Sequence, residues 1–199
     1  MHVAEKSVGV CICLMIGLSP LTFANGLFYP ELRSDLQEYQ DASKCYPNVG
    51  EWYLMYRNYE VDAIIGGTAK CVKYSIHGSY ENFSTSAMFT FGRDGYTKGK
   101  LSLSSTDCYI GKNVKTFVPQ NNNYPQEWTQ IIYMNCETCF VARHPYAKNG
   151  LGCSLWRRSN NLYESAYCCE FIFDQNCGAS RKYYMYNPTC TWTTTTETP

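Results

Sequence analysis

The stretch CETCFVARHPYAKNGLGCSLWRRSNNLYESAYCCEFIFDQNC, residues 136–177, decides the fold of this chain. It holds six of the twelve cysteines and two runs typical of β-strands, residues 139–143 and 153–157. The segment between them, residues 144–150, contains a proline and an Asn-Gly pair, which are signals of chain reversal. We therefore expect a β-hairpin at the centre of this stretch.

A helix is predicted directly after the hairpin. Four residues recur at helical spacing and would share one face: Leu162, Ala166, Cys169 and Phe173. The neighbours Cys168 and Cys169 would point about 100° apart on such a helix. Each is therefore expected to form a disulfide with a different part of the protein.

The two ends of the chain are expected to lie outside the folded domain. Residues 1–24 have the pattern of a secretory signal peptide, because Lys6 precedes an apolar segment too short to span a bilayer and small residues predict cleavage after Ala24. The Thr-rich segment 191–199 is predicted to be a disordered tail that offers hydroxyls for O-glycosylation. One domain, residues 25–190, remains between them.

The cysteines indicate an oxidising, extracellular compartment. Cys11 and Cys13 leave with the signal peptide, so the secreted chain keeps ten of the twelve cysteines, an even number that suits five disulfides. A zinc or redox site is the alternative for Cys136 and Cys139, but no second Cys-x-x-Cys and no paired histidine would complete it. The sequence also lacks the motifs of serine hydrolases, zinc proteases and phosphate-binding loops. We expect a binding protein without a cofactor and not an enzyme.

Six further runs typical of strands precede the hairpin at near-regular spacing: residues 51–59, 68–76, 84–91, 100–105, 112–118 and 129–135. Within residues 30–43, Leu32, Leu36 and Tyr39 have helical spacing, which predicts a short N-terminal helix. Eight strands between two helices indicate an all-β fold, an eight-stranded antiparallel up-and-down barrel. Side chains would fill such a barrel or share its interior with one small ligand.

The composition argues against some partners. The 17 basic and 17 acidic residues give a formal net charge of zero and are scattered, so neither nucleic acid nor a membrane surface is indicated. The 18 tyrosines suit a pocket that needs both apolar rings and hydroxyls, or they simply populate the strands. Asn82 begins an N-glycosylation sequon, Asn82-Phe83-Ser84, in a predicted loop before a strand.

Several short motifs carry a resemblance to one family. They are Lys70-Cys71-Val72, Gly150-x-Gly152-Cys153-x-Leu155-Trp156, Cys168-Cys169-Glu170-Phe171, and Met185-Tyr186 followed by Cys190. With them, the chain resembles the tick salivary lipocalins of the histamine-binding protein family from residue 40 to residue 190. The resemblance implies a lipocalin-type barrel with the C-terminal helix packed on its wall. It also implies a monomer, secreted in saliva, that captures host mediators such as histamine, serotonin or eicosanoids and so evades host defence.

The same resemblance implies specific disulfides. The expected pairs are Cys71 with Cys190, Cys139 with Cys169, and Cys153 with Cys177. Cys45, Cys108, Cys136 and Cys168 then remain, and we expect Cys45 to pair with Cys168 and Cys108 with Cys136. Spacing alone does not choose among so many connectivities.

The ligand residues depart from the family pattern. Amine-binding members have an Asp directly after the cysteine that corresponds to Cys139 and a Glu directly before Leu155-Trp156, whereas this chain has Phe140 and Ser154 at those places. A protonated amine in a low-dielectric barrel needs a carboxylate partner, and loss of one partner of a buried pair costs about 2–5 kcal/mol. The pocket of this chain is therefore expected to be less acidic.

Part of the amine-binding pattern is kept. Tyr59 and Asp62 match the Tyr-x-x-Asp that follows the first strand in amine binders, and Trp128 and Trp156 match aromatic residues of the pocket. One carboxylate and three aromatic rings would hold a cation by an ion pair and cation–π contacts. The alternatives are a solvated loop acid for Asp62 and core packing for Trp156.

Two hypotheses about function follow. In the first, the protein sequesters a small mediator, by family a biogenic amine or, given the less acidic pocket, a fatty acid or eicosanoid. In the second, the barrel is filled and the loops bind a host protein such as a complement or clotting factor. A cavity of about 300 Å³ or more would favour the first hypothesis, and a packed interior would favour the second.

Overall fold

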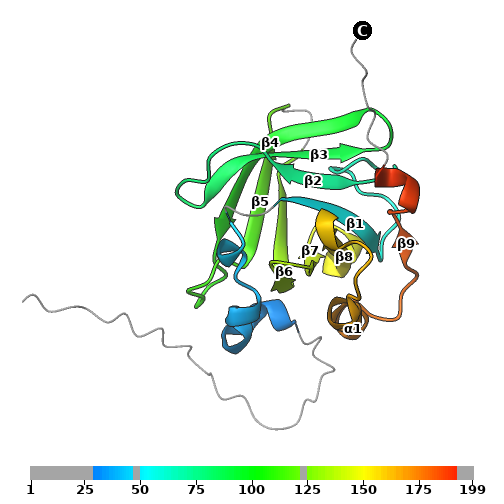
Figure 1. Cartoon of the computed structure of the whole chain (residues 1–199). Helices are drawn as coiled ribbons and strands as arrows, with labels where there is room; N and C mark the ends of the chain where they lie inside the picture. Colours follow the sequence, from blue (N-terminus) through cyan, green and yellow to red (C-terminus); the bar gives the residue numbers. More distant parts are fainter. Residues whose placement is uncertain (1–28, 47–49, 122–124, 192–199) are drawn as a thin grey trace, which may run out of the picture.

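The computed structural model describes residues 29–46, 50–121 and 125–191. The predicted signal peptide and the predicted tail beyond residue 191 lie outside these residues. Eight antiparallel strands follow one another in the order β2-β3-β4-β5-β6-β7-β8-β1, and β1 also pairs with β2, which closes a barrel. The expected all-β, eight-stranded barrel with a helix on its wall is confirmed (Figure 1).

The strands of the barrel are β1 (Glu51–Arg57), β2 (Lys73–Ile76), β3 (Ser84–Phe91), β4 (Gly95–Ser104), β5 (Val114–Pro119), β6 (Glu127–Asn135), β7 (Cys139–His144) and β8 (Gly152–Arg158). The helix α1 (Tyr167–Asn176) follows, and a two-residue strand, β9 (Tyr183–Tyr184), pairs with the end of β1. Six 3-10 turns complete the described part of the chain: η1 (Pro30–Leu32), η2 (Ser34–Tyr39), η3 (Ala42–Lys44), η4 (Lys148–Gly150), η5 (Ser159–Asn161) and η6 (Pro188–Thr191).

The predicted short N-terminal helix is present as three short 3-10 helices, η1, η2 and η3, and not as one continuous helix. Two of the residues that suggested a helix, Leu32 and Tyr39, are exposed. The segment is instead anchored by buried polar groups: Gln40 donates to the carbonyl of Pro30 (2.8 Å), and Glu31 forms a buried ion pair with Arg143 of β7. These two buried polar contacts hold the segment against the barrel, so the segment does not need a continuous apolar face of one helix.

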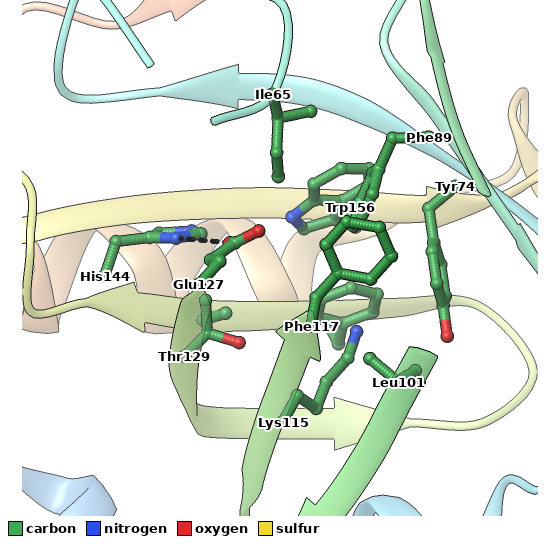
Figure 2. A pocket seen from close by; sticks show the side chains of 12 residues that line it. Ile65, Tyr74, Phe89, Leu101, Lys115, Phe117, Glu127, Thr129, His144 and Trp156 are labelled. Carbon is green, nitrogen blue, oxygen red and sulfur yellow. Dashed lines mark ion pairs between the residues drawn. The ribbon is translucent and has the colours of Figure 1, made fainter. Parts of the chain in front are cut away.

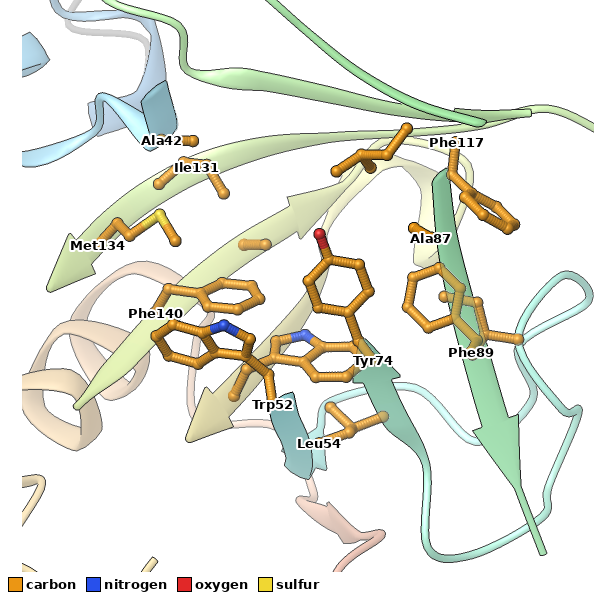
Figure 3. Close-up of a cluster of buried hydrophobic side chains, with 14 of the residues drawn as sticks. Ala42, Trp52, Leu54, Tyr74, Ala87, Phe89, Phe117, Ile131, Met134 and Phe140 are labelled. Atoms are coloured by element: carbon orange, nitrogen blue, oxygen red, sulfur yellow. The ribbon is translucent and has the colours of Figure 1, made fainter. Parts of the chain in front are cut away.

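Two apolar layers lie on opposite sides of the barrel wall, because successive side chains of a strand point to opposite faces. Large residues fill the interior: Trp52, Leu54, Tyr74, Phe89, Leu101, Phe117, Ile131, Phe140 and Trp156. Figure 3 labels Trp52, Leu54, Tyr74, Phe89, Phe117, Ile131 and Phe140 among them. A second cluster joins the outer face of β7 and β8 to α1, and includes Val141, Leu155, Cys169 and Phe173. A bulge between Leu54 and Tyr56 moves β1 from the first layer to the second.

Four disulfides connect the described residues: Cys71–Cys190, Cys139–Cys169, Cys153–Cys177 and Cys45–Cys136. The first three are the expected pairs, whereas the fourth corrects the expected pairs Cys45–Cys168 and Cys108–Cys136. Cys45 follows η3 at the end of the barrel where β6 turns into β7, and Cys136 lies in that turn. Cys108 and Cys168 take part in none of these four disulfides.

Candidate ligand site in the barrel

A loop covers the mouth of the barrel. We call residues 59–70, between β1 and β2, the mouth loop; its Ile64 and Ile65 are buried in the interior cluster. Asp62 and Gly67 form a β-bridge that folds the loop back on itself. Gly66 has a φ of +73°, and a Cβ there would lie 2.6 Å from the ring of Phe91, so glycine allows the loop to rest on β3.

The space beneath the loop is a cavity of about 20 Å³, enough for one water molecule. Its lining combines apolar residues with four polar ones, Lys115, Glu127, Thr129 and His144 (Figure 2). The interior is therefore packed, and the cavity is far smaller than a small-molecule pocket.

Two of the predicted ligand residues, Phe140 and Trp156, lie inside the barrel and line this cavity. Their rings are stacked, with centroids 5.7 Å apart and an angle of 8° between planes. Ser154 is also buried and faces inward, where its Oγ accepts a hydrogen bond from Trp156 Nε1 (2.7 Å) and lies 2.6 Å from His144 Nε2. The alternation expected from sequence, with Ser154 and Trp156 on one face, agrees with these contacts.

The interior contains an ammonium group of its own. Lys115 of β5 is only 7% exposed, and its Nζ lies 4.5 Å from the ring centroids of both Tyr74 and Phe140. Within the described residues, Nζ makes neither a hydrogen bond nor a salt bridge. Burial lowers the pKa of Lys115 to about 8, although the nearby Glu127 carboxylate opposes this shift. Lys115 thus places a cation of the protein itself in cation–π contact with these two rings.

The interior acid is Glu127, which the sequence analysis missed. Its Oε1 lies 3.4 Å from His144 Nδ1 and 3.1 Å from the Tyr146 hydroxyl oxygen, so it is one of two carboxylates within reach of that hydroxyl. Trp128, the predicted pocket residue, is 42% exposed on the outer wall and does not line the cavity. The missed signal is alternation along β6: Glu127, Thr129 and the buried Ile131 share a face that excludes Trp128.

Tyr59 and Asp62 are brought together, as the sequence motif implied, but within the mouth loop. The Asp62 carboxylate is buried and accepts hydrogen bonds from the Tyr59 hydroxyl (2.8 Å) and from the backbone amides of Ile64 (3.0 Å) and Ile65 (2.9 Å). Arg57 Nη1 lies 3.7 Å from it. Asp62 is thus neither a solvated acid nor part of the cavity lining; its acceptor capacity is used to fold the loop.

Two further observations concern the described residues. They contain no group of three or more His, Cys, Asp or Glu side chains placed to hold a metal, and no helix among them is long and apolar enough to cross a membrane. Asn82, the glycosylation candidate, is exposed in the turn between β2 and β3.

Comparisons with known proteins place this barrel among lipocalins. Japanin from Rhipicephalus appendiculatus, solved with bound cholesterol, is 10% identical over 70% of this chain and 95% of its own, with a TM-score of 0.50. Lobster apocrustacyanin A1 is 17% identical over 78% of this chain and 88% of its own, with a TM-score of 0.52. At such identities these structures show the fold alone.

Among curated proteins, the search found no match. The family comparison is more specific, because the model described as tick histamine binding protein matches residues 30–192. That range includes all eight strands, α1 and the four disulfides. The chain belongs to the tick histamine-binding protein family.

Proposed function

We propose that this protein is a secreted carrier that sequesters one small host mediator inside its barrel. Family membership and the polar groups enclosed in an otherwise aromatic interior support this proposal. In the closed state the cavity is too small for a mediator, so the mouth loop and some interior side chains must move when a ligand binds.

The ligand is an apolar molecule with a carboxylate, such as a fatty acid or eicosanoid, in preference to a biogenic amine. One observation carries this choice: Lys115 is a buried ammonium without a hydrogen-bonding partner among the described residues. An ionised carboxylate would supply that partner, and a hydrogen bond between charged groups contributes about 1.5–3 kcal/mol.

An amine ligand would meet a less favourable interior. Its ammonium would share the aromatic site with Lys115, and like charges in a low-dielectric interior repel strongly. Asp62, the acid retained from the amine-binding pattern, is already occupied by four donors from Tyr59, Tyr146, Ile64 and Ile65. Glu127 is left as the interior acid for such a ligand, and His144 lies against it.

Calorimetric titration with arachidonate and with histamine tests the choice of ligand. Wild type should bind arachidonate, and Lys115→Met should weaken that binding by about 10- to 100-fold, equivalent to the 1.5–3 kcal/mol of the lost pair. Arachidonate binding should also weaken from pH 7 to pH 9.5, because the Lys115 ammonium, with its pKa of about 8, loses its proton over this range.

The matched control is Lys98→Met, which makes the same change at an exposed lysine on the outer wall of β4 and should leave both titrations unchanged. Tight histamine binding by wild type would refute the carboxylate preference. Arachidonate binding that Lys115→Met leaves intact would refute the role of Lys115.

The packed interior also favours a second candidate, a protein that binds a host protein through its surface. An apolar groove of about 300 Å³ crosses the outer wall between η2 and α1, lined by residues that include Leu36, Ile132 and Ile172. Exposed Tyr167 and Phe171 lie on the neighbouring helix α1, and large exposed apolar patches often mark binding surfaces. If neither ligand binds, inhibition of complement or clotting by wild type, lost in Phe171→Asp, would support this candidate.

A further inference from the structure

The hydroxyl of Tyr146 lies between two carboxylates that belong to different parts of the barrel mouth. It is 3.1 Å from Asp62 Oδ2 in the mouth loop and 3.1 Å from Glu127 Oε1 on β6. His144 Nδ1 is also 3.1 Å from this hydroxyl. The same oxygen therefore connects the loop to the barrel wall.

A phenol has one proton, so Tyr146 donates to one of the two carboxylates at a time. Burial and the negative charges of Glu127 and Asp62 raise the pKa of Tyr146 well above its ordinary value, so the hydroxyl stays protonated and remains a donor. Two acceptors compete for this donor, and they differ in that Asp62 belongs to the mouth loop.

A chain of hydrogen bonds runs from the barrel interior to this hydroxyl. Trp156 Nε1 donates to Ser154 Oγ, which leaves the Ser154 proton for His144 Nε2. His144 Nδ1 then carries the ring proton and donates it towards the Tyr146 oxygen, a tautomer assigned from these contacts. Displacement of Trp156 by a ligand would therefore disturb the bonds of Tyr146.

The mouth loop lies between two firmly held points. Before it, Asn58 donates to the carbonyls of Leu151 (3.0 Å) and Cys177 (2.9 Å). After it, Cys71 is bound to Cys190. Between these points, the barrel holds the loop through Tyr146, the buried Ile64 and Ile65, and Arg57, which donates to the carbonyls of Glu60 and Gly67.

We propose that the mouth loop is the gate of the barrel and that Tyr146 is its latch, with the hydroxyl on Asp62 when the gate is closed and on Glu127 when it is open. This proposal rests on the proposed function, in which a ligand enters the barrel. The charged and titratable groups around the latch are Asp62, Glu127, His144, Tyr59 and Arg57. Tyr146 acts as a positioning residue, because it controls access without contacting the ligand.

Amide hydrogen exchange in the ligand-free protein tests the latch. Tyr146→Phe should speed exchange at Ile64 and Ile65 by tenfold or more, because their amides bond Asp62 beneath the closed loop. Glu127→Gln, which weakens the competing acceptor, should slow exchange at the same amides. Tyr163→Phe, at a tyrosine that is 80% exposed, is the matched control and should change neither amide.

Exchange at Ile64 and Ile65 should become faster in Tyr146→Phe and slower in Glu127→Gln. If Tyr146 only stabilised the fold, both variants would lose stability and exchange would become faster in both. Unchanged exchange in Tyr146→Phe, or faster exchange in Glu127→Gln, would overturn the proposal. With arachidonate, Tyr146→Phe should raise the association and dissociation rates by similar factors. If arachidonate binds neither protein but the exchange rates change as stated, the latch holds and the proposed ligand fails.

Discussion

Lys115 brings a positive charge into a barrel interior built from aromatic rings. Contacts with the rings of Tyr74 and Phe140 offset part of the cost of removing the ammonium from water. The offset is incomplete, because burial still lowers the pKa of this lysine from 10.5 to about 8. In the free protein, the charged form of Lys115 therefore lowers stability at neutral pH.

Lys115→Met should raise the free energy of unfolding at pH 7 by about 3 kcal/mol, since the pKa is lowered from 10.5 to about 8 and each pKa unit is about 1.4 kcal/mol. Between pH 8 and 10.5 the unfolded chain binds a proton that the native lysine has lost, so in wild type this group makes stability rise with pH. The variant lacks that rise, and the gap between the two proteins should shrink towards pH 10.

Urea denaturation of both proteins at pH 7, 8, 9 and 10 measures this gap, with Lys98→Met as the exposed control. A gap that stays constant with pH would mean that Lys115 is not a buried cation in the native state.

Single residues of the site were predicted unevenly. Phe140, Ser154 and Trp156, which the family motif singled out, are buried inside the barrel, and their contact with a ligand stays a prediction. Glu127 and Lys115 were missed, because a charged residue in a strand is ordinarily assigned to the solvent face. The signal that these two side chains point inward was alternation, because Glu127 shares a face of β6 with the buried Ile131 and Lys115 shares a face of β5 with the buried Phe117.

For α1, the sequence predicts which residues are buried better than it predicts where the helix begins. The four residues predicted to share its inner face, Leu162, Ala166, Cys169 and Phe173, are all buried. The helix nevertheless begins at Tyr167, because η5 and a turn precede it. The helical spacing of these residues correctly predicted that they are buried. It did not predict that the first two lie before the helix begins.

Phe173→Ala should lower the free energy of unfolding by about 3–5 kcal/mol, as for other fully buried phenylalanines. The ring is completely buried between α1 and the wall, with its centroid 4.8 Å from that of Tyr56 in a T-shaped contact. Phe171→Ala changes the same residue type on the same helix at an exposed position and should cost less than about 0.5 kcal/mol. Equal losses in the two variants, measured by chemical denaturation, would contradict this packing.

The strands differ in how well local sequence defines them. β3 matches its predicted range, because alternation and a clear turn bound it. β2 begins only at Lys73, since Cys71 adopts a left-handed φ of 57° that a strand does not tolerate. β4 begins at Gly95 and not at the predicted residue 100, and β9 is too short to show any period.

For the whole molecule, the disulfides depend on which segments the closed barrel brings together. The sequence offered four cysteines without a family partner, and spacing could not choose among their pairings. Cys45 and Cys136, 91 residues apart in sequence, meet because η3 and the β6–β7 turn lie at the same end of the barrel. Barrel closure, a property of the whole chain, therefore decides this pair.

Mass spectrometry of a non-reducing digest should find a peptide that joins Cys45 to Cys136. Cys168, exposed on α1 and outside the four disulfides, should react with a thiol reagent in the native protein. Cys168→Ser should remove the label from the peptide that contains residue 168, whatever the reagent does at Cys108, and leave the melting temperature unchanged. A peptide that joins Cys45 to Cys168 would show that the observed pairing is wrong.

The bulge in β1 has a consequence for the tolerance of this strand to changes in length. Trp52 and Leu54 face the interior, whereas Tyr56 packs against α1, so the extra residue, Met55, reverses the phase of the strand. The Met55 carbonyl also accepts the amide of Met185 (2.9 Å), which connects the C-terminal segment to the barrel. Deletion of Met55 would restore simple alternation and leave Tyr56 outward and Arg57 inward, with loss of the carbonyl that accepts Met185. A one-residue deletion elsewhere in the strand would instead turn one of its halves over, so we expect β1 to tolerate a change in length at the bulge and not on either side of it.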